Sequence, residues 1–182
     1  MVYILMADGF EEIEALTVVD VLRRAEIKIE MVSIGGELVT GAHGIVVKAD
    51  KLIGAINVDN AEMIILPGGM PGTKNLEASE DVQSLVKDAV DAKKWVSAIC
   101  AAPMILGNKG YLKNIEAICF PGFEKYLSGA IIKDRTVNVY KKFITSKGAG
   151  TSLDFAFAIV SVLRDEATAR DLMVRMQYNK RA

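Results

Sequence analysis

The sequence predicts an α/β domain built around a mostly parallel sheet. Short apolar runs of strand length alternate with segments that repeat apolar residues at the period of a helix, and this order is typical of parallel α/β architecture. The composition is that of a globular domain, because 51% of the 182 residues are hydrophobic, 25% are charged and only 4 are proline. At this length roughly 70% of the unfolded chain's surface can be buried, so we expect residues 1–182 to form one domain.

The chain up to residue 99 supplies four strands of this sheet and two of its helices. The first strand is uniformly apolar, and Ile13, Leu16, Val19 and Leu22 recur near one face of the helix that follows. A later segment contains two glycines, which permit the positive φ angles of a tight hairpin turn. In chain order, we expect a strand at 2–6, a helix at 12–25, a strand at 28–34, a hairpin at 39–49, a strand at 62–66, a helix at 80–92 and a strand at 95–99.

The rest of the chain continues this alternation. Pro103 lies in the first turn expected for the next helix, where proline is tolerated because no intrahelical donor is lost. The remaining expected elements are strands at 117–119, 136–140 and 143–145 and helices at 152–163 and 166–178.

Composition and spacing exclude several classes of function. The 22 basic and 23 acidic residues give a net charge of -1 without a basic stripe, so we expect no nucleic-acid partner. The single histidine, His43, and the two cysteines, Cys100 and Cys119, lack metal-ligand spacing, so we expect no metal. The glycine turns at 68–69 and 148–150 lack phosphate-binding spacing, and we expect no nucleotide or other cofactor.

The start of the chain favours a cytoplasmic protein. Residues 1–6 are apolar but are followed at once by acidic residues, without the basic region or cleavage site of a signal peptide. The longest uncharged stretch, 96–106, falls short of the roughly 20 apolar residues that span a bilayer, so we expect no membrane partner. In a reducing compartment both cysteines are expected to be thiols.

Cys100 occupies a sharp junction between an expected strand and an expected helix. Small residues flank it, and the pattern resembles a nucleophile elbow, whose apical side chain stands clear of the backbone. A thiol at a helix N-terminus is expected to have a lowered pKa. The N–H of Ala101 and a glycine N–H from the turn at 66–69 would then stabilise charge on a substrate oxygen. The alternative is an ordinary buried cysteine, and the pattern leaves both interpretations open.

Three glutamates, Glu11, Glu12 and Glu14, follow the first strand at the same edge of the sheet. Acidic residues at a helix start are favoured by the helix dipole, which explains all three as capping and solubilising residues. A carboxyl group that faces the cysteine in a partly buried pocket would instead have a raised pKa and exchange protons with sulfur. Spacing alone does not choose among the three.

Several segments of the sequence form a specific combination. They are Glu11-Glu12-Ile13-Glu14 with 19–25 behind it, Leu66-Pro67-Gly68-Gly69, Ala98-Ile99-Cys100-Ala101-Ala102-Pro103, and Gly148-Ala149-Gly150-Thr151-Ser152 leading into 154–156. Together they resemble the DJ-1/ThiJ/PfpI superfamily, most closely its DJ-1-like branch. The resemblance implies a flavodoxin-like sandwich with helices on both faces of the sheet, and a homodimer. It also implies that Cys100 is the reactive, oxidisable cysteine, that Glu14 is its carboxyl partner, and that the backbone of Gly69 and Ala101 forms the oxyanion pocket.

The activities that this resemblance implies are glyoxalase or deglycase chemistry on methylglyoxal-type aldehydes, redox sensing through a sulfinic cysteine, chaperone activity and, in the PfpI branch, peptidase or amidase activity. Two positions depart from the family pattern. PfpI-type peptidases carry a histidine where this chain has Ala101, which leaves no adjacent base for acyl transfer. Many DJ-1 relatives carry a histidine where this chain has Phe120, so Glu14 alone would have to move protons.

His43 and Cys119 each have two interpretations. A histidine in a glycine-rich turn is typically a solvated side chain. The resemblance instead implies that the hairpin of one subunit offers a basic residue toward Glu14 or Cys100 of the other. Cys119 is typical of a core strand residue, and the alternative is a resolving thiol for Cys100.

Two functions remain, and both depend on Cys100. In the first, its thiolate adds to a small-molecule aldehyde, and Glu14 exchanges protons with the adduct until a hydroxy acid is released. In the second, the small-molecule partner is an oxidant, and protonated Glu14 stabilises a sulfinate, so that the oxidation state of Cys100 is the signal. The missing histidine at position 120 favours the sensor, whereas the family activities favour the enzyme.

Overall fold

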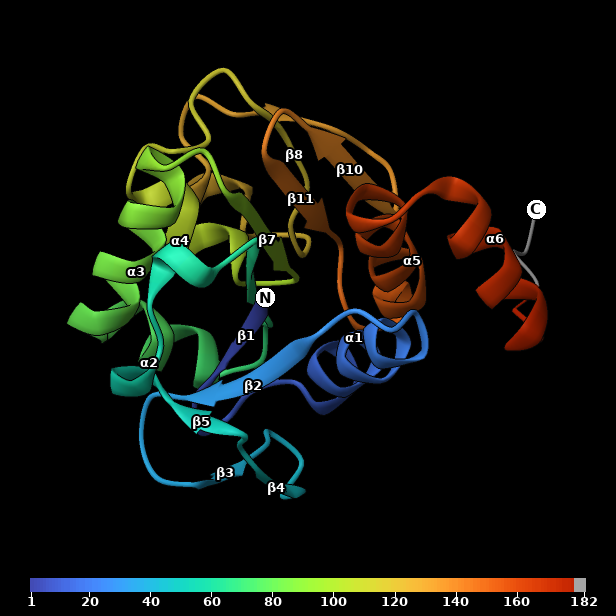
Figure 1. Cartoon of the computed structure of the whole chain (residues 1–182). Coiled ribbons are helices and arrows are strands. Elements are labelled where there is room, and N and C mark those ends of the chain that lie inside the picture. The colour runs from blue at the N-terminus through green and yellow to red at the C-terminus, as the bar shows by residue number, and fades with distance from the viewer. Residues whose placement is uncertain (179–182) are drawn as a thin grey trace.

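A seven-stranded sheet forms the centre of the structure, a computed structural model that describes residues 1–178 (Figure 1). Its strands, in spatial order, are β10 (Val137–Tyr140), β11 (Phe143–Ser146), β7 (Trp95–Ile99), β6 (Met63–Leu66), β1 (Val2–Met6), β2 (Ile29–Ser33) and β5 (Lys51–Leu52). Every neighbouring pair is parallel except β10 and β11. The mostly parallel sheet expected from the sequence is confirmed.

Strands β1, β6 and β7 end at the same edge of the sheet. Ile4 lies opposite Ile65 in the register, and Leu66 lies opposite Ala98. The three segments that leave these strands therefore start side by side. They carry the glutamates, the glycine turn and the cysteine that the sequence singles out.

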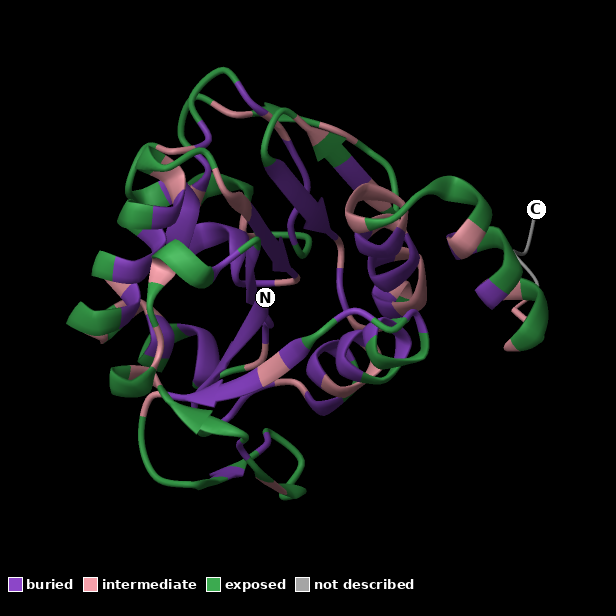
Figure 2. Cartoon of the chain, viewed as in Figure 1, coloured by how far each residue is buried: buried purple, intermediate pink, exposed green. Residues whose placement is uncertain are grey.

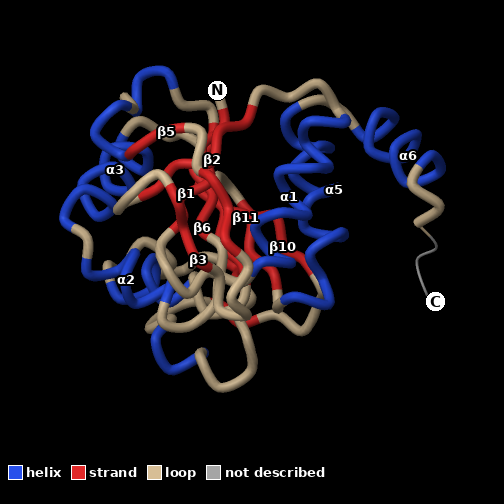
Figure 3. The backbone as a smooth tube through the Cα atoms, turned by 90° about the horizontal axis from the view of Figure 1, so that it is seen from below, coloured by secondary structure: helices blue, strands red, loops and turns tan. Residues whose placement is uncertain are grey.

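Helices cover both faces of the sheet (Figure 3), which confirms the flavodoxin-like sandwich. On one face lie α1 (Glu12–Arg24) and α5 (Ser152–Leu163), with α6 (Glu166–Arg175) packed against α5, and on the other lie α2 (Gly72–Ala78), α3 (Glu80–Asp91) and α4 (Pro103–Asn108). Side chains of β1 alternate between the two cores: Ile4 and Met6 face α1 and α5, whereas Tyr3 and Leu5 face α3 and α4.

The buried stripe of α1 is rotated relative to the sequence-based prediction. Val19 and Leu22 are buried as expected, but the prediction for Ile13 is wrong, because that side chain is 55% exposed. The stripe passes through Ala15 and Val18 instead, at the three- and four-residue spacings of a helix face. This rotation turns two acidic side chains of the first helical turn inward.

The smaller elements agree only in part with the prediction. The expected hairpin forms from β3 (Leu38–Thr40) and β4 (Val46–Lys48). The strand expected at 117–119 is β8 (Glu116–Ala117), and it pairs with β9 (Ile131–Ile132) outside the main sheet.

The last helix ends before residue 178, because Gln177 adopts a left-handed φ of 54°. Helix α2 and strand β5 were not predicted, since a proline and glycine start and a two-residue strand give no periodic signal. Short 3-10 helices complete the fold: η1 (Ile53–Ala55), η2 (Val58–Asn60), η3 (Glu124–Tyr126) and η4 (Ala149–Thr151).

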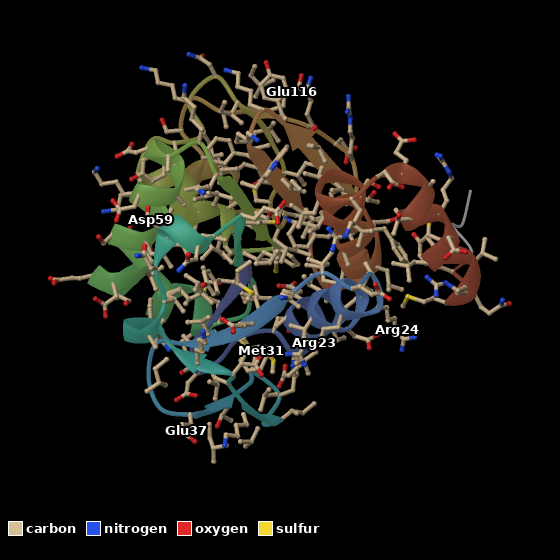
Figure 4. All side chains as sticks on the ribbon, viewed as in Figure 1. Arg23, Arg24, Met31, Glu37, Asp59 and Glu116 are labelled. Carbon is tan, nitrogen blue, oxygen red and sulfur yellow. The ribbon has the colours of Figure 1, made fainter. Side chains whose placement is uncertain are left out.

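Buried residues gather along the sheet and the inner faces of the helices, whereas the β3–β4 hairpin is largely exposed (Figure 2). Charged side chains project outward (Figure 4); at the end of α1, Arg23 pairs with Asp50 and Arg24 with Asp20. These two arginines suit the negative end of the helix dipole. Within residues 1–178 no helix has the length and apolar character needed to cross a membrane.

Candidate active site

Cys100 lies at a strained turn directly after β7. Its φ of 64° is left-handed, a conformation that non-glycine residues rarely adopt. Two backbone hydrogen bonds fix this turn: the Cys100 N–H donates to Ser146 O at 3.0 Å, and the Phe120 N–H donates to Cys100 O at 2.7 Å. Helix α4 then begins with Pro103 in its first turn, as predicted. The backbone is therefore that of an elbow, with a half-buried thiol at its apex.

Glu14 reaches this elbow from the first turn of α1. It is 1% exposed, and its Oε2 atom accepts a hydrogen bond from the Gly68 N–H at 2.8 Å. A side-chain carbon on Gly68 would lie 2.5 Å from Glu14 Oε2 and 2.6 Å from Cys100 Cβ. Only glycine at this position lets the carboxyl group and the cysteine approach each other.

The environment of Glu14 adjusts its affinity for a proton. Burial raises the pKa of Glu14 to about 7, although hydrogen bonds from Cys100 and from the Gly68 backbone oppose the rise. The Oε1 atom is buried, and the described residues give it no hydrogen bond of standard geometry. The thiol nevertheless lies close enough to lower the pKa of this carboxyl group.

The thiol pKa shifts in the direction opposite to the sequence-based expectation. Burial raises the pKa of Cys100 to about 12, with further contributions from the Glu14 charge and from the hydrogen bond to Glu14. Helix α4 does not compensate, because it has six residues and begins three positions after the cysteine. Between these two pKa values the pair carries one negative charge, on the carboxylate while the thiol is protonated or on sulfur once Glu14 has taken the proton, and below pH 7 both groups hold their protons.

Two backbone N–H groups point to the same sulfur. Hydrogen bonds from Ala101 and Gly69 lower the pKa of Cys100 and partly offset burial. Gly69 has a φ of 92°, and any side chain there would collide with the backbone of Gly9 and Phe10. The structure thus brings Gly69, Ala101, Glu14 and Cys100 together, and their assignment as oxyanion pocket and reacting pair remains a proposal.

Phe120 lies beside the cysteine, where the resemblance implied a histidine in relatives. Apart from its backbone bond to Cys100, its ring approaches Gly148: a side-chain carbon there would be 3.3 Å from Phe120 Cδ2 and 3.9 Å from Cys100 Sγ. Phe120 is 46% exposed. A phenyl group at this place contributes apolar contact but cannot transfer protons.

His43 contacts the other glutamates of its own chain. Its Nδ1 atom lies 2.8 Å from Glu12 Oε2 and 3.7 Å from Glu11 Oε2, while its ring remains 68% exposed. The Glu12 bond and the Glu11 charge raise the pKa of His43. The proposed contact with Glu14 or Cys100 of a second subunit stays a prediction.

Glu12 is a buried carboxylate whose partners the sequence did not reveal. Burial alone would raise its pKa, but hydrogen bonds from the His43 ring and from the backbone of Glu12, His43 and Ile45 lower it to about 2. Ligand atoms of Glu11, Glu12 and His43 lie within 4.8 Å of one another, close enough to hold a divalent cation. Because the His43 N–H and ring already occupy both Glu12 oxygens, an ion pair explains the cluster without a metal.

Cys119 has the surroundings of a core residue. It is buried within the core on the α3 and α4 side, whereas Cys100 packs against the core on the α1 and α5 side. Burial and the nearby Glu124 charge raise the pKa of Cys119 to about 12. Both cysteines are free thiols. The core interpretation of Cys119 therefore fits the structure better than a resolving thiol.

Fold and site together define a flavodoxin-like α/β protein with a cysteine and a carboxyl group paired at the carboxyl edge of its sheet. Residues 1–162 match the model of the DJ-1/PfpI family. The chain belongs to this family, which confirms the resemblance identified from its motifs.

Similar proteins come from distant organisms. Over 165 residues the chain is 34% identical to the Danio rerio Parkinson disease protein 7 homolog, covering 88% of this chain and 87% of the relative. It is 29% identical over 171 residues to the Caenorhabditis elegans glutathione-independent glyoxalase DJR-1.2, covering 93% and 91%. The Arabidopsis thaliana protein DJ-1 homolog B is 35% identical over 157 residues, and the chain spans 85% of its own length but only 36% of that longer protein.

Solved structures agree with the fold. The structure of oxidized Toxoplasma gondii DJ-1 superposes with a TM-score of 0.94 at 31% identity, covering 98% of both chains. Drosophila melanogaster DJ-1beta gives a TM-score of 0.92 at 27% identity, again covering 98% of both chains.

Proposed function

We propose that this protein acts in carbonyl or oxidative stress, and that Cys100 and Glu14 convert small 2-oxoaldehydes to 2-hydroxy acids. The observation that carries the proposal is the buried Glu14 carboxyl group, which the Gly68 N–H holds next to Cys100. Burial raises the pKa of Glu14 to about 7. A carboxyl group with this pKa accepts and donates protons at neutral pH. The name of the C. elegans relative, a glyoxalase, supports the same chemistry.

The reaction starts with transfer of the thiol proton to the Glu14 carboxylate. Sulfur then adds to the aldehyde carbon, and the carbonyl electron pair moves to oxygen, which the N–H groups of Gly69 and Ala101 stabilise. Glu14 returns its proton to this oxygen and forms a neutral hemithioacetal. No cofactor takes part in this addition.

Isomerisation and hydrolysis complete the cycle. Glu14 removes the hydrogen on the former aldehyde carbon as a proton, and the electron pair forms an enediol with the neighbouring ketone carbon. Return of the proton to that neighbour oxidises the first carbon, reduces the second and leaves a 2-hydroxy thioester. Water then cleaves the carbon–sulfur bond, so the net reaction adds one water to the oxoaldehyde and restores the Cys100 thiol.

Loss of methylglyoxal in the presence of purified protein tests this proposal. We expect wild-type protein to produce lactate and Cys100→Ser to lose the activity. The hydroxyl group of serine is a much weaker acid than a thiol, so Glu14 would not convert it to a reactive anion. Cys119→Ser is the matched control and should retain it. Equal consumption by wild type and Cys100→Ser would overturn the proposal.

A non-enzymatic redox sensor is the second candidate. The buried Glu14 Oε1, which lacks a standard hydrogen bond from the described residues, supports it, because a protonated carboxyl group could donate there to an oxidised sulfur. One molecule of hydrogen peroxide would convert the thiolate to a sulfenic acid, and a second would yield the sulfinate. Each peroxide transfers one oxygen atom to sulfur and leaves as water. Mild peroxide should add two oxygens to Cys100, and a resistant Cys100 would remove this candidate.

The remaining features of the proposal concern assembly and other activities. We expect a cytoplasmic homodimer that uses the exposed apolar residues of the α1 start and the hairpin, Ile13, Leu38, Ile45 and Val46. Light scattering on the purified protein measures its oligomeric state.

Chaperone activity is an alternative that does not depend on the pairing of Cys100 with Glu14. Peptidase or amidase activity of the PfpI type has the weakest support, because Ala101 replaces the base.

A further inference from the structure

A cavity of about 480 Å³ opens between the loop before α2, the start of α4 and the 3-10 helix η3. This volume lies in the range of small-molecule binding sites. We call it the side pocket, and its lining residues are Met70, Pro71, Lys74, Met104, Phe123 and Tyr126.

Two connections link the side pocket to the cysteine site. On one side, Met70 directly follows Gly69, whose neighbour Gly68 contacts both Glu14 and Cys100. On the other, Phe120 beside the sulfur packs edge-on against Phe123, with ring centroids 6.3 Å apart.

The aromatic rings form a row that leads away from the sulfur. Phe123 continues the row to Tyr126, with ring centroids 5.7 Å apart. The row begins at Phe120, whose phenyl ring adds apolar surface between the thiol and the cavity.

The lining is apolar with positive charge at its rim. Five of the six lining residues offer hydrocarbon, thioether or aromatic surface, and none is acidic. The sixth is Lys74, and Lys125 Nζ lies 5.1 Å from the centroid of the Tyr126 ring. Thioether and aromatic side chains make favourable contacts with aromatic rings, and the two lysines favour a neutral or anionic group over a cationic one.

We propose that the side pocket binds the substituent of a substrate whose reactive carbon lies at Cys100, and that it selects aryl or large apolar groups over methyl. For the reaction above, the preferred substrates are aryl-substituted or long alkyl-substituted 2-oxoaldehydes. The proposal rests on the proposed function for the identity of the aldehyde, but binding of the substituent requires only a reactive Cys100.

Alkylation of Cys100 tests the pocket without turnover. Iodoacetamide and N-phenyl-iodoacetamide react alike: a carbon–sulfur bond forms, the carbon–iodine bond breaks, iodide leaves and the thiol proton passes to solvent. The phenyl-to-parent ratio of rate constants is measured at Cys100 by mass spectrometry and divided by the ratio for free cysteine. We expect about a tenfold preference for the phenyl reagent in wild type, the size of selectivity that an apolar pocket gives.

Two variants change the pocket in opposite ways. Met70→Trp fills it and Phe123→Ala removes part of its wall, and each should bring the normalised ratio to within about twofold of one. Val139→Trp is the matched control, because it places the same large side chain at an exposed apolar site on β10. Its ratio should equal that of wild type.

Charged reagents and methylglyoxal turnover provide two further tests. A 4-carboxyphenyl reagent should react faster than a 4-trimethylammoniophenyl reagent, and Lys74→Glu should reduce or reverse that order. A wild-type ratio near one, or Cys100 that neither reagent modifies, overturns the pocket proposal even if methylglyoxal is consumed. A tenfold ratio without methylglyoxal consumption keeps the pocket and removes the proposed enzyme function, so the two failures are distinguishable.

Discussion

Two buried carboxyl groups lie two residues apart on α1 and have opposite proton affinities. Glu12 is 4% exposed and Glu14 is 1% exposed, yet the pKa of Glu12 falls to about 2 and that of Glu14 rises to about 7. Residues two apart on a helix point to different sides. Glu12 therefore faces the hairpin, and Glu14 faces the cysteine elbow.

The difference reflects both depth of burial and hydrogen-bond donors, because Glu14 is more deeply desolvated and has fewer donors than Glu12. Glu12 accepts from the His43 ring and from two hairpin N–H groups, which offsets the cost of burying its charge. Glu14 accepts one backbone N–H and faces a weakly acidic thiol. Glu12 thus anchors the hairpin, whereas Glu14 is left able to carry a proton.

The largest expected effect separates the two glutamates by activity. Glu14→Gln should lower methylglyoxal turnover by about 10²-fold to 10⁴-fold, because the amide cannot exchange the protons that the reaction requires. Glu12→Gln should change it by less than about threefold, since a fixed anion takes no part in proton transfer. Steady-state kinetics measure both, with circular dichroism to verify folding. Equal losses in the two variants would contradict the division of roles.

Two glycines, Gly68 and Gly41, contact Glu14 and Glu12 respectively, so substitutions there test the same difference between the two carboxyl groups. An added methyl group in Gly68→Ala would collide with Glu14 and Cys100, and in Gly41→Ala it would collide with the Glu12 carboxyl group. We expect each variant to lose about 1–3 kcal/mol of unfolding free energy in urea titrations. Only Gly68→Ala should also lose turnover, by at least about tenfold. Retained turnover in Gly68→Ala would show that close approach of the pair is not needed.

The sequence was sufficient for the elements that position the elbow. Strands 2–6 and 95–99 have the bounds expected from their apolar runs, and Pro103 occupies the helix start where proline is tolerated. Periodic patterns and turn chemistry are local, so one chain segment is enough to reveal them.

The contacts that distinguish the two glutamates could not be predicted from local patterns. Glu12 pairs with His43, which is 31 residues away, and Glu14 meets Gly68, which is 54 residues away. The motif resemblance assigned Glu14 to the cysteine, and one local signal agrees with that: Glu14 precedes buried Val18 by one helical turn. Nothing local indicated that Glu12 is buried, or that burial would raise the thiol pKa.

The pH dependence of stability should have opposite slopes for the two carboxyl groups. The pKa of Glu14 is raised from 4.5 to about 7, so its ionisation destabilises the native state as the pH rises through that window. The pKa of Glu12 is lowered from 4.5 to about 2, so its contribution is fully present above 4.5 and is lost as the pH falls toward 2.

Urea titrations from pH 3 to 8 measure these slopes. Relative to wild type, Glu14→Gln should gain stability between pH 5 and pH 8. Glu12→Gln should show a constant deficit above pH 5 that shrinks toward pH 3. Parallel curves for all three proteins would mean that neither pKa is shifted by folding.

The smallest expected effect concerns the exposed partner of Glu12. His43→Ala removes the ring bond but leaves the backbone N–H groups of residues 43 and 45 on Glu12, so the hairpin should loosen without unfolding. The raised His43 pKa makes the charged pair fully present below pH 6.5, with its contribution lost as the pH rises through the raised value. Hydrogen exchange of hairpin amides should therefore accelerate in His43→Ala more at pH 6 than at pH 9. The same variant tests the proposed reach across a dimer: if the alkylation rate of Cys100 and the oligomeric state are both unchanged, His43 serves only the hairpin of its own chain.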